Sequence, residues 1–373
     1  MRRAVGSLPR RRGRPGADGR AVAPGRAGVH SAVNIHAVRA RCASPGRLAW
    51  PGAIITSTQI TEYGFKVHES ATVPLAPALA GERRTLDSPA AGLVSWYESA
   101  PDSGAGAPLL LVHSVNAAGS AYEMRPLYEH YRTRRPVFAI DLPGFGFSGR
   151  TDRAYTPRLM TDAVHALLDE IGRRHPRMPV DAVALSLGCE FLARAAVEAP
   201  DRFRRLALVS PTGFSGRSLR TGAAGTHLGR PGLLRIVGRP AWRRGLFGLL
   251  TRPAVIRYFL ERTWGAKTID EGLWAYDIAT TRPPGAEFAP LQFLCGFLFS
   301  ADSGTLYQSL RHPVWVVHGV RGDFVDYRAL RSFEGRPGWH VGVFDTGALP
   351  HFERPADYLA RCDAFLDGPA APA

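Results

Sequence analysis

Two kinds of hydrophobic pattern alternate along the chain from about residue 84. Short apolar runs rich in β-branched residues predict strands at 93–97, 109–113, 137–142, 180–185, 206–209, 314–318 and 340–344. Between them, apolar residues recur at spacings of three and four, as in 157–172 and again in 358–366, which predicts amphipathic helices. Strands that alternate with helices are typical of βαβ units, so we expect a mostly parallel sheet covered by helices on both faces.

One segment, residues 213–308, departs from this alternation. It contains apolar stretches of helical character, punctuated by proline and glycine, and no clear strand. We therefore expect a helical cap that is inserted into an α/β core formed by residues 84–212 and 309–373. Residues 56–83 carry no clear pattern and remain an unassigned lead-in to the core.

The N-terminal segment, residues 1–55, is rich in arginine, glycine, proline and alanine and has neither helical nor strand periodicity. This composition is typical of a disordered extension. The segment lacks the compact apolar region of a secretory signal. An organelle transit peptide and upstream sequence included by an early start assignment both remain open.

The chain has 373 residues and a formal charge of +15, which is concentrated in two places. Residues 1–50 contain eleven arginines and one acid, and residues 217–262 contain ten arginines and one acid. The rest of the chain is mildly acidic, so the charge does not predict a nucleic-acid partner for the core. The basic cap is compatible with contact with an anionic membrane surface, although a solvated basic face is the simpler interpretation.

Other features of the composition narrow the class of protein. No apolar run is long enough for a transmembrane helix. The four cysteines, Cys42, Cys189, Cys295 and Cys362, are widely spaced and include no C-x-x-C, so we expect neither a zinc site nor a disulfide framework. The resulting expectation is a cytoplasmic protein, without a metal or organic cofactor, whose oligomeric state the sequence does not define.

The first chemical signal is a serine between small residues. Ser186 lies in Ala184-Leu185-Ser186-Leu187-Gly188, directly after a predicted strand and before a helical segment. A serine on such a sharp turn exposes its hydroxyl above the sheet, and small neighbours two residues away relieve the crowding. An ordinary strand-to-helix turn would have a similar sequence, so this pentapeptide alone makes Ser186 only a candidate nucleophile.

The segments after two other predicted strands could form the oxyanion site and the loop beside such a nucleophile. Acyl transfer needs backbone N–H groups aimed at the developing oxyanion. The expected donors are Leu187, after the serine, and Val115, after the strand that ends in His113. We expect His113 itself to bond loop backbone. The glycine-containing segment 141–148 predicts a shaped loop beside the site, since it is too short for a dinucleotide fingerprint.

A general base and its orienting acid would complete the set. Asp323 follows the strand predicted at 314–318, and His351 lies in a loop before the last helix. An imidazole can take the serine proton, and a carboxylate can fix its tautomer and stabilise the imidazolium. The chain order Ser186, Asp323, His351 is the order expected on this architecture. Asp326 is a weaker alternative to Asp323 as the acid.

Residues from about 84 to 367 resemble the α/β-hydrolase family on the stretches 111–114, 141–148, 184–188, 318–323 and 350–352. The resemblance implies a mostly parallel eight-stranded sheet flanked by helices, with residues 213–308 as a lid over the site. Three departures are visible: Ser114 and Ala184 replace glycines, and an extra residue precedes Asp323.

The leading hypothesis is a serine hydrolase that acts on an ester or related acyl bond of a moderately hydrophobic small molecule. Four aromatic residues of the cap are candidates for substrate binding: Trp264, Trp274, Phe293 and Phe297. Acyltransferases, cofactor-free haloperoxidases and carbon–carbon bond hydrolases use the same triad and remain alternatives. A non-catalytic ligand-binding member of the fold is the alternative from another functional class.

Overall fold

The structure is a computed structural model that describes residues 74–101, 106–322 and 324–368. All of them belong to one compact unit, Gly52–Ala373. The predicted extension, residues 1–55, and most of the lead-in, residues 56–83, lie outside the described residues. No helix in the described ranges is both long enough and apolar enough to cross a membrane.

Eight strands form a single sheet in the order β1-β2-β4-β3-β5-β6-β7-β8. Strand β2 is antiparallel to both of its neighbours, and all other pairs are parallel. The expected mostly parallel, eight-stranded sheet is therefore confirmed. The strands are β1 (Glu82–Ser88), β2 (Gly92–Ser99), β3 (Leu109–Val112), β4 (Val137–Asp141), β5 (Val180–Leu185), β6 (Phe203–Val209), β7 (Val314–Gly319) and β8 (Trp339–Phe344).

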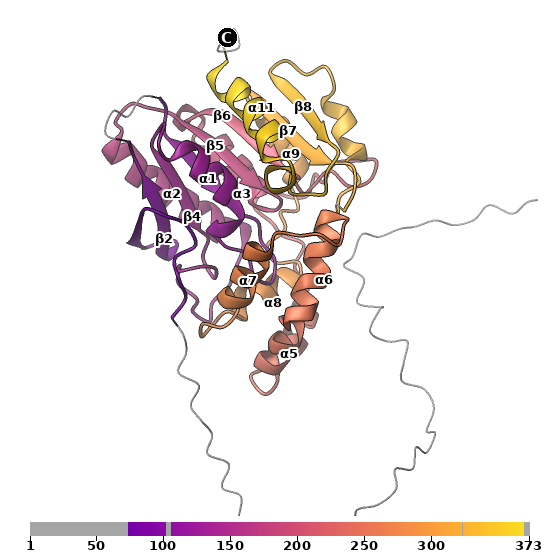
Figure 1. Ribbon diagram of the computed structural model, residues 1–373. Helices are drawn as coiled ribbons and strands as arrows, with labels where there is room; N and C mark the ends of the chain where they lie inside the picture. Colours follow the sequence, from indigo (N-terminus) through magenta and orange to yellow (C-terminus); the bar gives the residue numbers. More distant parts are fainter. Residues whose placement is uncertain (1–73, 102–105, 323, 369–373) are drawn as a thin grey trace, which may run out of the picture. The chain divides into compact units, whose positions relative to one another are not determined.

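The central strands are buried on both faces because helices cover the sheet on both sides (Figure 1). Side chains of β3 alternate between the two cores: Leu110 and Val112 pack on one side, and Leu109 and Leu111 on the other. Helices α2 and α3 contribute to the first core, and α1 and α11 to the second. The flanking helices are α1 (Arg125–Tyr131), α2 (Pro157–Arg174), α3 (Gly188–Glu198) and α11 (Pro355–Asp367).

Between β6 and β7 the described chain is helical, as the pattern of residues 213–308 predicts. Its only strand-like pairing is an isolated bridge between His227 and Ser300. Helix α9 packs on α3 of the core, whereas α5 to α8 gather at one end of the sheet (Figure 1). We call residues 210–310 the helical insertion. Its helices are α4 (Pro231–Val237), α5 (Arg243–Leu250), α6 (Pro253–Trp264), α7 (Glu271–Thr280), α8 (Phe288–Leu294) and α9 (Ser303–Ser309).

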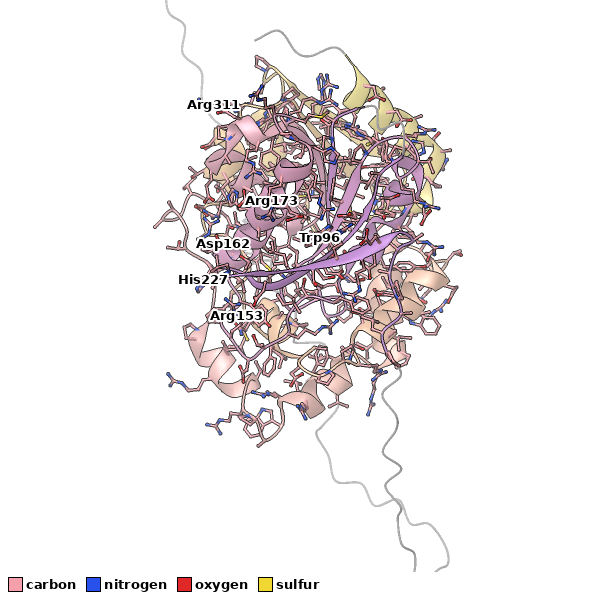
Figure 2. All side chains as sticks on the ribbon, turned by 90° about the vertical axis from the view of Figure 1, so that its left-hand side faces the viewer. Trp96, Arg153, Asp162, Arg173, His227 and Arg311 are labelled. Carbon is pink, nitrogen blue, oxygen red and sulfur yellow. The ribbon has the colours of Figure 1, made fainter. Side chains whose placement is uncertain are left out.

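Short helical turns lie at several loop positions, and two of them matter for the site. The turn η2 precedes α1, and α10 precedes α11. The side chain of Trp96 on β2 packs into the first core, and Figure 2 shows its place on the sheet. The short elements are η2 (Ala121–Met124), η3 (Pro200–Arg202), η4 (Arg328–Phe333) and α10 (Pro350–Glu353).

Candidate active site

Ser186 occupies the sharp turn between β5 and α3. Its φ of 52° lies in the left-handed region, which a residue with a side chain adopts only at a cost. Its N–H donates to the carbonyl oxygen of Val209 at 2.8 Å, which fixes the turn above the end of β6. A Cβ atom on Gly188 would lie 2.4 Å from the carbonyl oxygen of His113, so only glycine allows α3 to start this close to β3. The strained turn leaves the Ser186 side chain partly exposed.

The two expected oxyanion donors, Leu187 and Val115, remain predictions. The backbone N–H groups of Leu187 and Val115 have no hydrogen-bond partner among the described residues. Both residues are buried. Buried N–H groups are nearly always paired in proteins, so unpaired ones are suited to receive a ligand oxygen.

The loop that carries Val115 is organised by a buried carboxylate, Glu123 of η2. Its oxygens accept hydrogen bonds from the Ser114 N–H at 2.7 Å, the Ser114 hydroxyl at 2.9 Å and the Asn116 side-chain amide at 2.7 Å. Burial raises the pKa of Glu123, and these donors oppose the rise. Ser114, which stands where the family usually has glycine, is thus part of this hydrogen-bonded loop.

Sequence reasoning missed Glu123. The available signal was an isolated acid between Tyr122 and Met124, in a stretch of small and apolar residues that follows a buried strand. An acid in such a position has to find hydrogen-bond donors when the segment is buried.

A second buried carboxylate, Asp141, shapes the loop at 141–148. It accepts hydrogen bonds from the N–H groups of Ala121 and Phe147, both at 2.9 Å. Burial raises its pKa to about 6. A Cβ on Gly146 would lie 2.0 Å from the Asp141 carboxyl carbon, so the loop can wrap around the acid only with glycine there. The expected shaped loop is therefore built around Asp141, which also ties it to η2.

His113 bonds loop backbone, as expected. Its Nε2 accepts a hydrogen bond from the Leu142 N–H at 2.9 Å, and its Nδ1 donates to the Ser114 carbonyl oxygen. Burial lowers its pKa to about 4. A neutral imidazole with both nitrogens engaged joins the ends of β3 and β4 and is not a proton carrier.

Loops at the carboxyl edge of the sheet are tied to one another by hydrogen bonds. The N–H of Ser210, which directly follows β6, donates to Val317 of β7 at 2.6 Å. The Ser210 hydroxyl donates to the Ala348 carbonyl oxygen at 2.7 Å, in the loop before α10. Because the Ser186 N–H bonds Val209, these contacts bring the serine turn and the histidine loop to one region of the sheet edge.

His351, in α10, is fully buried. Its Nε2 donates to the backbone oxygen of Glu123 at 2.8 Å, and its Nδ1 has no hydrogen-bond partner within the described part of the chain. Burial lowers the pKa of His351 to about 4, so the ring is neutral at pH 7. No hydrogen bond joins His351 to Ser186 among the described residues; in this arrangement the imidazole is held by the η2 backbone.

Asp323 lies outside the described residues, and its role remains a prediction. The segment before it is anchored beside the histidine loop, because the N–H of Val320 donates to the Thr346 carbonyl oxygen at 3.0 Å. Asp326, the alternative acid, pairs with Arg328 at 2.5 Å near the surface. That ion pair lowers the pKa of Asp326, and no hydrogen bond links it to His351 in the described chain.

The helical insertion contributes a buried carboxyl group with an unpaired oxygen, Asp277 of α7. One of its oxygens has no hydrogen-bond partner among the described residues. Burial and the nearby charge of Glu123 raise the pKa of Asp277 well above its usual range. Sequence reasoning missed Asp277, since an acid in an amphipathic helix is usually solvated.

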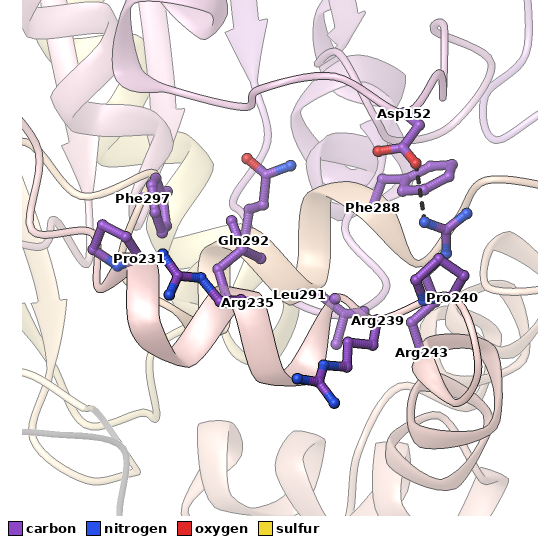
Figure 3. A pocket seen from close by; sticks show the side chains of 12 residues that line it. Asp152, Pro231, Arg235, Arg239, Pro240, Arg243, Phe288, Leu291, Gln292 and Phe297 are labelled. Carbon is purple, nitrogen blue, oxygen red and sulfur yellow. Dashed lines mark hydrogen bonds and ion pairs between the residues drawn. The ribbon is translucent and has the colours of Figure 1, made fainter.

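The four aromatic candidates for substrate binding occupy different environments. Trp264 is buried, and Trp274 and Phe293 are partly buried within the insertion. Phe297 lines a groove of about 570 Å³ beside α4 and α8 (Figure 3). Neither Ser186 nor His351 lines this groove, so its side chains are separate from the proposed reaction centre.

Among the described residues, no group of three or more histidine, cysteine or acidic side chains is arranged so that it could hold a metal ion. Cys189, Cys295 and Cys362 are buried free thiols. Cys42 lies outside the described residues.

Comparison with known proteins identifies a curated relative of this chain. A curated protein, the 2-hydroxymuconate semialdehyde hydrolase of Pseudomonas sp. (strain CF600), is 32% identical over 116 residues. The match covers 31% of this chain and 40% of that protein, so the chain spans less than half the length of this relative.

Two solved structures illustrate the likeness of fold. The meta-cleavage product hydrolase of Pseudomonas fluorescens IP01 aligns with a TM-score of 0.57 and 15% identity, covering 76% of this chain and 97% of that one. A thermophilic esterase from Thermogutta terrifontis aligns with a TM-score of 0.58 and 19% identity, covering 77% and 98%. At such identities the likeness shows the fold alone.

The sequence profile of the Alpha/beta hydrolase family matches residues 109–361. The matched range is more than half of the chain and includes the serine turn, the loop organised by Glu123 and the histidine loop. The protein therefore belongs to the alpha/beta hydrolase family.

Proposed function

We propose that the protein is a serine hydrolase that cleaves an ester or related acyl bond of a moderately hydrophobic small molecule. The observation that carries the proposal is the strained Ser186, at φ 52°, together with the N–H groups of Leu187 and Val115, which have no hydrogen-bond partner among the described residues. Residues held in sparsely populated backbone conformations cluster at active sites, which supports a catalytic role for Ser186. Family membership supports hydrolysis as the type of reaction.

In the proposed reaction the Ser186 oxygen attacks the acyl carbon while His351 takes the hydroxyl proton. The oxyanion accepts hydrogen bonds from the N–H groups of Leu187 and Val115. When the tetrahedral intermediate collapses, the bond to the leaving group breaks, and the imidazolium returns the proton to that group. Water, deprotonated by the same imidazole, then attacks the acyl-enzyme and releases the acid.

This sequence requires His351 to give up its bond to the Glu123 carbonyl oxygen, to exchange its proton from Nε2 to Nδ1, and to turn the bare Nε2 toward the Ser186 hydroxyl. Catalytic hydrogen bonds are often loose before substrate binds. Asp323 would then accept the Nδ1–H and fix the productive tautomer. The helical insertion, with its aromatic side chains, would act as the lid that excludes water from the acyl group.

A second candidate is hydrolysis of 2-hydroxymuconate semialdehyde itself. It is favoured by the 32% identity to the curated relative that is named for this substrate. The same serine, base and oxyanion donors would serve the reaction, so the geometry alone does not separate the two substrate classes.

A substrate panel distinguishes these candidates. Purified protein is assayed with 4-nitrophenyl esters of increasing acyl length, with and without an alcohol as acyl acceptor, and with 2-hydroxymuconate semialdehyde. We expect the esters to give the highest kcat/KM, and the Ser186→Ala variant to lose about 10⁴-fold or more of it. Higher kcat/KM for the semialdehyde would favour the second candidate, and equal activity of wild type and variant would reject both.

A further inference from the structure

Helix α4 has an apolar sequence that is only partly covered. Its seven residues, Pro-Gly-Leu-Leu-Arg-Ile-Val, are mostly apolar, yet none is buried. In α5, which follows, Phe247 is the single buried residue. Helices of a globular protein normally direct an apolar stripe to the core. These two helices instead present apolar side chains to their surroundings, with Ile236 58% exposed and Leu249 51% exposed.

The exposed apolar residues lie in a segment without acidic residues. Residues 211–260 contain nine arginines and neither aspartate nor glutamate. Five of these arginines form no ion pair with any residue that the structure describes: Arg217, Arg230, Arg235, Arg239 and Arg252. The large hydrophobic residues exposed in the same segment are Leu228, Ile236, Trp242, Leu249, Tyr258 and Phe259. We call this combination the cap surface.

The inner side of α4 is also incompletely packed. A groove of about 570 Å³ runs beside α4 and α8, with apolar walls that include Leu234 and Leu291. Arg235 and Arg239 of this region line the groove as well, as Figure 3 shows. Arg243 is held differently, by an ion pair with Asp152 at 2.9 Å. Helix α4 therefore borders an incompletely filled groove, and its exposed side chains include Arg235, at the groove, and Ile236.

We propose that the cap surface docks on an anionic lipid bilayer. Ile236, Trp242 and Leu249 would enter the interfacial layer, while Arg235 and Arg239 would contact lipid phosphates. Apolar and aromatic side chains combined with arginine are the composition of interfacial helices. An anionic leaflet attracts such cations when they lie close to its surface.

An anionic bilayer would accommodate both the positive charge and the exposed apolar side chains of the cap surface. Water would solvate the charge but not the apolar side chains, and a second copy of the chain would cover the apolar side chains but repel the charge. A solvated basic face would require the arginines but not the exposed Ile236, Trp242 and Leu249. A symmetric dimer formed through this surface would bury the apolar side chains but place the arginines of one copy against those of the other. This repulsion arises because the two partners of a two-fold interface present the same patch.

The test is co-sedimentation of the full chain with vesicles of phosphatidylcholine alone and with 30% phosphatidylserine, at low and high salt. About fivefold weaker partitioning is expected for each arginine removed from an anionic surface. The Arg235→Gln/Arg239→Gln variant should therefore bind the anionic vesicles about 25-fold more weakly. The Ile236→Ser/Leu249→Ser variant should lose binding at least about tenfold, since it removes two apolar side chains from the interface.

Matched controls come from another surface of the same body. Arg311 is exposed and lies at the end of the body opposite the insertion helices (Figure 2). Val343, on β8, is an exposed apolar residue away from the insertion. The Arg311→Gln and Val343→Ser variants should bind as the wild type does. Because the readout is vesicle binding, Ser186→Ala protein should give the same result, which separates this proposal from the proposed reaction.

Three outcomes would overturn the proposal. One is equal binding to neutral and anionic vesicles. Another is an equal effect of the Arg235→Gln/Arg239→Gln and Arg311→Gln changes. The third is concentration-dependent self-association that the Ile236→Ser/Leu249→Ser variant abolishes, which would assign the surface to a second copy of the chain. Analytical ultracentrifugation of the same samples without lipid measures the last of these.

Discussion

Replacing Ser186 by glycine and by alanine separates backbone strain from chemistry at the serine turn. Both variants lack the hydroxyl, so both should lose the proposed activity. Their stabilities should differ, because a side chain at φ 52° carries a cost that glycine does not. A left-handed conformation costs a residue with a Cβ about 1–2 kcal/mol.

The expected size follows from two opposing contributions. Glycine removes the strain, but it also makes the unfolded chain more flexible, which costs about 0.4–1 kcal/mol. Ser186 is only partly buried, so loss of its Cβ leaves no large cavity. Ser186→Gly should therefore have a free energy of unfolding about 1 kcal/mol higher than that of Ser186→Ala.

Urea denaturation followed by circular dichroism measures this difference, provided that the two variants give the same m value. Arg177 offers a matched control, since it has a φ of 65°, is exposed and has no place in the site. Arg177→Gly should be more stable than Arg177→Ala by a similar amount, with activity unchanged. A Ser186→Gly variant less stable than Ser186→Ala, beside the expected result at Arg177, would refute the strained turn.

Three further predictions concern the buried titratable groups. Glu123→Gln should destabilise the protein by about 1–3 kcal/mol and lower kcat, because an amide replaces an acceptor of three hydrogen bonds in the loop of Val115; unchanged denaturation and kinetics would contradict this. Asp277 has a folded-state pKa above its unfolded value, so stability falls as the pH rises above that unfolded value, where the unfolded chain releases a proton that the folded chain retains. Asp277→Asn should therefore gain stability over wild type progressively above about pH 4, and a gain that does not change with pH would argue against a buried acid. The acid limb of the pH profile of kcat/KM should lie near pH 4, where buried His351 protonates, and a limb near pH 7 would show a hydrated or charge-paired imidazole.

The sequence predicted the central strands β3, β4, β5, β6 and β7 well because a strand covered on both faces is a continuous apolar run. Strand β5, for instance, is buried at every position and matches the predicted range 180–185. Strand β1 was missed, since its sequence, Glu-Arg-Arg-Thr-Leu-Asp-Ser, is polar and largely exposed at the sheet edge. Such a strand is defined by its pairing with β2, not by its own pattern.

The site was predicted in part, for a similar reason. The turn at Ser186 depends on local sequence, so its position after a strand and before a helix could be read from residues 180–198. The partners of the buried acids could not. Glu123 meets His351 across more than two hundred residues, and Asp277 comes from the helical insertion. Those contacts depend on tertiary packing, for which one sequence contains no direct signal.

The most direct test of the proposed reaction is covalent labelling of Ser186. Purified protein is treated with a fluorophosphonate, and the adduct is located by mass spectrometry of peptides. We expect one phosphonyl group per chain, attached to Ser186, with no labelling of Ser186→Ala and slow labelling of His351→Ala. Labelling of another residue, or equal labelling of the wild-type and Ser186→Ala proteins, would contradict the proposed reaction.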